Sequence, residues 1–237
     1  MEKHLSELVE KLTGASGANL KSVLLYGSAA GGEFQKKFSD VNVLCILGRL
    51  DAAELQKLNA VAVWWGRKGY AAPMVFTQDE LTRSADIFAI ELLDIKARHR
   101  VLHGEDIVAA IDVPMGLHRV QVERELRTHM VRLRQGYLAM PGDHKAVLAL
   151  MTSSISSFAT LFRHALLAMG EQPPVHKREA VTRLAELLGF DASAFHAIYE
   201  VRKGQRKPAQ LDIPATFHAY LNGVGCVADE VDRRLAT

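Results

Sequence analysis

The spacing of hydrophobic and polar positions changes near residue 115 and divides the chain into two parts. Over residues 1–114, short apolar runs typical of strands alternate with helical patterns, which predicts a mixed-sheet α/β (α+β) domain. Over residues 115–237, apolar residues recur every three or four positions in stretches separated by Pro and Gly, which predicts an all-α helical bundle. We therefore expect two domains and no strand after residue 120.

Three apolar runs are predicted to form neighbouring strands of the sheet. Residues 23–26 and 41–47 have the β-branched bias of short buried strands. Residues 87–95 form the third run, in which acidic residues interrupt the apolar ones. In the second part, helical patterns cover residues 117–140, 145–169, 177–188, 192–203 and 213–235.

The polar residues between the first two runs are the strongest candidates for chemistry. Gly27-Ser28 ends the first predicted strand with small residues, which allow backbone to approach a ligand closely. Asp40 and Asn42 are two residues apart on the second predicted strand, so their side chains project from the same face. Two oxygen-bearing side chains would then face the Gly-Ser turn.

Gly27-Ser28, eleven intervening residues and Asp40-Val41-Asn42 resemble the signature of the DNA polymerase β-type nucleotidyltransferase superfamily. That signature is Gly-Ser (or Gly-Gly), a spacer of this order, and Asp-x-Asp or Asp-x-Glu. The tract is closest to the small-substrate branch, which includes kanamycin nucleotidyltransferase and the minimal nucleotidyltransferases. An α/β domain followed by a helical bundle is also the layout of this branch. A β-hairpin with a glycine-rich loop would share the dipeptides but not their combination.

The resemblance implies transfer of a nucleoside monophosphate from an NTP to a hydroxyl of a small molecule or a protein. Metal ions, Mg²⁺ or Mn²⁺, would clamp the triphosphate and neutralise charge, so the protein must present clustered oxygen ligands. On this interpretation Asp40, Asn42 and Glu91 hold the metal, and Asp40 and Glu91 are catalytic. The turn at Gly27 and Ser28 would bind the β- and γ-phosphates as an anion nest.

Glu91 is assigned because the family's third carboxylate follows an apolar residue on a neighbouring strand. Asp94 is the second choice, and if the run is extended the two acids point to opposite faces of the sheet. Asn42 departs from the family pattern, because a neutral amide removes one formal charge from the site and should weaken the second metal. A nucleotide-binding or regulatory pseudoenzyme with a degraded metal site is therefore an alternative function.

A second alternative is an interaction module of toxin–antitoxin type. Arg124 and His129 stand in an Arg-x4-His arrangement that resembles the ribonuclease motif of HEPN domains, which are helical bundles often partnered with minimal nucleotidyltransferases. A spacing of five residues on one helix suits a shared site poorly, so we interpret both as surface residues.

The composition of the chain excludes few classes of binding partner. A net charge of +2 and a pI of about 8.5 are too weak a bias to indicate nucleic acid, although they do not oppose a nucleotide ligand. The two cysteines, Cys45 and Cys226, have no metal-binding spacing, and no apolar run approaches the roughly 18 residues of a membrane span. We expect a cytoplasmic protein without a membrane partner, and a homodimer stays open.

Overall fold

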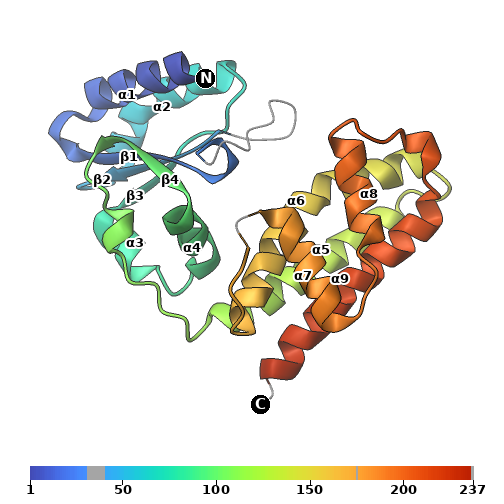
Figure 1. Ribbon diagram of the computed structural model, residues 1–237. Helices are drawn as coiled ribbons and strands as arrows, with labels where there is room; N and C mark the ends of the chain where they lie inside the picture. The colour runs from blue at the N-terminus through green and yellow to red at the C-terminus, as the bar shows by residue number, and fades with distance from the viewer. Residues whose placement is uncertain (31–40, 175, 236–237) are drawn as a thin grey trace. The chain divides into compact units, whose positions relative to one another are not determined.

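The chain forms two compact units, Met1–Met115 and Gly116–Thr237, in a computed structural model that describes residues 1–30, 41–174 and 176–235. The first unit is a four-stranded mixed sheet with helices, and the second is helical (Figure 1). The predicted fold class is therefore confirmed, and the described residues contain no strand beyond residue 120.

The sheet has the strand order β3-β2-β1-β4. β1 (Leu20–Tyr26) lies inside the sheet and is antiparallel to both β2 (Asn42–Leu47) and β4 (His99–Gly104), whereas β3 (Met74–Thr77) is parallel to β2. Residues of β1 and β2 are buried on both faces of the sheet, which explains why these two strands appear in the sequence as continuous apolar runs.

Helices cover both faces of this sheet (Figure 1). From residue 23 onward, the odd-numbered residues of β1 and β2 pack with α1 (Glu2–Ser16) and α2 (Ala52–Arg67) in one hydrophobic cluster, which Leu20 also joins. The even-numbered residues pack with α3 (Gln78–Arg83) and α4 (Ala89–Ala97) in a second cluster on the opposite face. Beyond the register shift between Leu20 and Ser22, side chains of β1 and β2 therefore alternate between the two faces.

The prediction of a strand over residues 87–95 is wrong. Residues Ala89–Ala97 form helix α4, and the strand beside β1 is β4, which follows this helix. Ala89, Leu92 and Ile95 are buried at a spacing of three residues, so they form one face of a helix while Glu91 is exposed. An apolar run of this length does not distinguish a strand from a buried helix.

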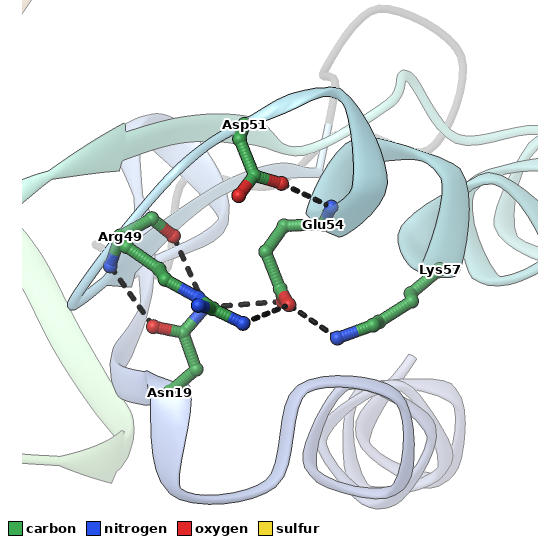
Figure 2. Close-up of polar contacts among 5 residues, drawn as sticks. All are labelled: Asn19, Arg49, Asp51, Glu54 and Lys57. Atoms are coloured by element: carbon green, nitrogen blue, oxygen red, sulfur yellow. Dashed lines mark hydrogen bonds and ion pairs between the residues drawn. The ribbon is translucent and has the colours of Figure 1, made fainter.

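Two carboxylates, the exposed Asp51 and the buried Glu54, hold the N-terminus of α2 (Figure 2). The Asp51 carboxylate caps the helix by accepting the backbone N–H of Glu54 at 2.9 Å. The Glu54 side chain is 2% exposed, pairs with Lys57 and Arg49, and accepts a hydrogen bond from Asn19 Nδ2 at 3.1 Å. Asn19 also bonds both backbone groups of Arg49. This network lies after the C-terminal end of β2, so it anchors the sheet at the end opposite Asn42.

The described residues of the second unit form five α-helices: α5 (His118–Leu138), α6 (His144–Ala168), α7 (Lys177–Leu188), α8 (Ser193–Arg202) and α9 (Ile213–Leu235). α6 is the central helix and packs against the four others. It is long and apolar enough to span a membrane by length and composition, but here its apolar side chains supply much of the core of the bundle.

Candidate functional site

The end of β1 places Gly27 beside Asn42. Tyr26 and Asn42 are partners in the antiparallel register, and Gly27 follows Tyr26 with φ +74°, a conformation that residues with a Cβ rarely adopt. A Cβ at Gly27 would lie 3.3 Å from Nδ2 of Asn42. The backbone conformation at position 27 therefore requires glycine, and the nearby amide of Asn42 leaves little room for a Cβ. The fold thus brings two of the predicted site residues, Gly27 and Asn42, together.

Gly27 contributes space rather than a free N–H group. Its backbone N–H donates to the carbonyl of Arg98 at 3.3 Å, and its own carbonyl accepts the N–H of Ala30 at 3.1 Å. Ser28 is the middle residue of the short 3₁₀ turn Gly27–Ala29. The phosphate-binding role of Gly27 and Ser28 stays a prediction, and Asp40 lies outside the described residues.

Three polar side chains form a row across the sheet at this point. Tyr26 pairs with Asn42 on β2 and with His99 on β4, and paired residues project from the same face. Tyr26 packs against the cluster that includes residues of α4, so the row lies on the face covered by α3 and α4. We call Asn42, Tyr26 and His99 the donor row, because each can donate a hydrogen bond.

His99 is held by two acceptors. Its Nδ1 lies 2.8 Å from the carbonyl oxygen of Ile95, and its Nε2 lies 2.9 Å from Oδ2 of Asp106. A carbonyl and a carboxylate only accept, so each ring nitrogen of His99 faces a hydrogen-bond acceptor. Burial raises the pKa of Asp106, but hydrogen bonds from His99 and from the backbone N–H of Ala109 outweigh it and lower that pKa.

Glu91 approaches the donor row from helix α4 rather than from a strand. Burial raises the pKa of Tyr26, and the negative charge of Glu91 raises it further, which places the exposed Glu91 carboxylate near the phenol. The higher pKa keeps the phenol of Tyr26 protonated and able to donate. Sequence reasoning selected Glu91 but missed Tyr26, His99 and Asp106.

The described residues contain only part of the predicted magnesium site, because Asp40 lies outside them. β3 is the strand beside β2, and its parallel register begins with Leu44 opposite Met74, so it stops short of Asn42. β3 itself carries no carboxylate. Within residues 1–30, 41–174 and 176–235 there is no group of three or more His, Cys, Asp or Glu side chains that could hold a metal ion. Asn42 offers a neutral amide where the resemblance puts a carboxylate, the ligand that Mg²⁺ prefers.

Arg124 and His129 have surroundings typical of the surface of a helix. Arg124 is exposed on α5, whereas the ring of His129 packs edge-on against Phe158, with ring centroids 5.8 Å apart. Nε2 of His129 lies 4.0 Å from the Glu125 carboxylate, and burial lowers the pKa of this histidine.

Comparison with known proteins identifies the fold. No family model matches the chain, and no curated protein matches it by sequence. The structure aligns over 94% of this chain with 99% of spectinomycin adenyltransferase AAD(9) from Enterococcus faecialis, solved with ATP and spectinomycin, at a TM-score of 0.57 and 13% identity. The chain has the nucleotidyltransferase fold.

A nucleotidyltransferase-like protein from Exiguobacterium sibiricum also matches, over 95% of this chain and 74% of that one, with a TM-score of 0.39 and 12% identity. The nucleotidyltransferase fold confirms the resemblance seen in the sequence. At 13% identity the likeness to AAD(9) is one of fold, so the chemistry of the site must be argued from the residues of this chain.

Proposed function

We propose that this protein binds a nucleoside triphosphate beside Gly27 and Asn42 and has lost metal-dependent nucleotidyl transfer. Its function would then be that of a nucleotide-binding, regulatory pseudoenzyme. The observation that carries this proposal is the neutral amide of Asn42 at the start of β2, beside Gly27, where the resemblance puts a carboxylate. The shared fold with an adenyltransferase solved with ATP supports a nucleotide as the ligand.

The physical argument concerns charge. In nucleotidyl transfer the protein contributes mainly positioning, while metal ions neutralise the triphosphate and the charge that develops during in-line displacement. Mg²⁺ is usually held by one or two carboxylates together with phosphate oxygens and water. Replacing a carboxylate by an amide at Asn42 removes a unit charge from a site that must attract a divalent cation. Loss of the metal would abolish turnover and leave nucleotide binding.

Slow transfer of a nucleoside monophosphate to a hydroxyl of a small molecule is the second candidate. It is favoured by the Glu91 carboxylate, which lies near Tyr26 and could take the proton of an acceptor hydroxyl. AAD(9), an adenyltransferase of the same fold, was solved with both ATP and a small molecule, spectinomycin. In this candidate Asp40, Asn42 and Glu91 hold Mg²⁺ or Mn²⁺.

Equilibrium binding and turnover of each radiolabelled NTP, with Mg²⁺ and with Mn²⁺, test both candidates. We expect saturable binding without release of pyrophosphate and without transfer of label to a panel of hydroxyl compounds that includes spectinomycin. Transfer of label that Asp40→Asn abolishes, and that the exposed control Asp79→Asn leaves intact, would establish the second candidate. Absence of binding for every NTP would refute both.

A further inference from the structure

The outer face of helix α2 carries an uncharged row of exposed side chains. Leu58, Val61 and Trp65 are buried against the sheet, so the residues on the opposite side of the helix face away from it. Those residues are all exposed, and they are Ala52, Gln56, Asn59, Ala60, Val63 and Gly66. Val63 is 49% exposed, and Leu55 at the edge of the row is 52% exposed.

Helix α1, which lies beside α2 (Figure 1), has the ordinary surface of a helix in water. Its exposed residues include the charged Glu2, Lys3, Glu10 and Lys11. Between Ala52 and Gly66, a range that the structure describes completely, the only exposed charged residue is Lys57, and its ammonium group pairs with Glu54. An exposed row with so little charge marks a candidate contact with another protein surface.

The charges at the two ends of the row match those of a second, antiparallel copy of α2. Asp51 is exposed at the N-terminal end, and Arg67 and Lys68 are exposed at the C-terminal end. The other two cations near Asp51, Arg49 and Lys57, are engaged by Glu54. An antiparallel copy would bring Asp51 beside the partner's Arg67 and Lys68 at both ends, whereas a parallel copy would bring like charges together.

We propose that the protein forms a homodimer through the outer faces of two antiparallel α2 helices, related by a two-fold axis near Asn59 and Ala60. A two-fold axis makes each residue contact appear twice, so a row that complements itself suits this symmetry. The small residues of the row let two helices approach closely. α2 covers the face of the sheet opposite α3 and α4, so this dimer would leave the face that carries Tyr26 uncovered. The inference is therefore independent of the proposed function.

The first test is sedimentation equilibrium of the full chain at increasing concentration, which should show reversible association of monomers into dimers. Val63→Lys should weaken this association at least about tenfold, because the two-fold axis places two unpaired charges in the interface. The matched control is Val131→Lys, at a valine on α5 that is 47% exposed, and it should associate as wild type does. A monomer at every concentration, or equal association of the two variants, would overturn the inference.

Cross-linking tests the antiparallel arrangement and does not depend on Val63→Lys folding. In a Cys226→Ser background, where the remaining Cys45 is buried, a short bismaleimide should join Asn59→Cys to its own copy. Ala52→Cys should not be joined, because the antiparallel pairing sets the two copies of that residue about 22 Å apart along the helix axis. Cross-linking at both positions, or at neither, would contradict the proposed dimer.

Discussion

A buried pair of histidines should make the helical bundle sensitive to acid. His118 begins α5 and His164 lies near the end of α6, with Nε2 of His118 3.0 Å from Nδ1 of His164. The two residues are 1% and 4% exposed. One ring must donate and the other accept, so the contact requires that these two nitrogens share a single proton. Burial, and to a lesser extent the neighbouring His164, lower the pKa of His118 from 6.5 to about 4.

The magnitude follows from proton linkage. As the pH falls below 6.5 the unfolded chain binds a proton at position 118, whereas the folded chain resists it until about pH 4. The unfolded state therefore holds more protons in this window, and the free energy of unfolding decreases as the pH decreases. Between pH 7 and pH 5 the loss from this one group is about 2 kcal/mol, approaching about 3 kcal/mol below pH 4.

Hydrogen exchange of peptides from α6, corrected for the intrinsic rate at each pH, measures the free energy of opening the bundle. In His118→Gln a neutral amide can keep the hydrogen bond to His164 without titrating. Wild type should therefore lose about 2 kcal/mol more protection than His118→Gln between pH 7 and pH 5. His144→Gln, at the exposed first residue of α6, should behave as wild type. Equal losses in wild type and His118→Gln would refute the reasoning.

Two further changes test the packing of the first unit. Gly104→Ala should prevent stable folding, because its Cβ would lie 1.9 Å from the carbonyl oxygen of Lys21. The control is Gly142→Ala, which is also at positive φ but in open space. It should lower the free energy of unfolding by only about 1 kcal/mol, measured by thermal unfolding. Glu54→Gln should lower the unfolding temperature at pH 7. The hydrogen bond from Lys57 lowers the pKa of Glu54, so its stabilisation is lost as the pH falls through that pKa, and wild type and variant should converge in acid.

Strands with continuous apolar runs could be predicted from the sequence, whereas β4 could not. β1 and β2 are buried on both faces, and such burial requires continuous apolar runs that are visible without a structure. β4 has the sequence HRVLHG and lies at an edge of the sheet, so its alternation of polar residues gave no clear signal. The apolar run at residues 87–95 was assigned to a strand because its sequence does not show which of its faces is buried. That depends on the segments against which it packs.

The residues of the candidate site were likewise only partly predictable from the sequence. Gly27 and Asn42 could be placed together from the motif and the period of a strand. Tyr26 and His99 could not, because they meet through the pairing of β1 with β4, whose register is set by contacts between segments more than seventy residues apart. The one local signal was that Tyr26 ends an apolar run with a polar group.

On the proposed function, the residues at the ends of β1 and β2 would separate binding of a nucleotide from catalysis on it. Amide and phenol groups can donate hydrogen bonds to a triphosphate, yet they carry no positive charge, whereas a transferase places metal ions there. An interaction that stabilises the ground state and the transition state equally does not accelerate the chemical step. Hydrogen bonds from such neutral donors would reach oxygens that are already charged before transfer, so they would favour binding without lowering the barrier. A protein with this site would hold a nucleotide and leave it intact.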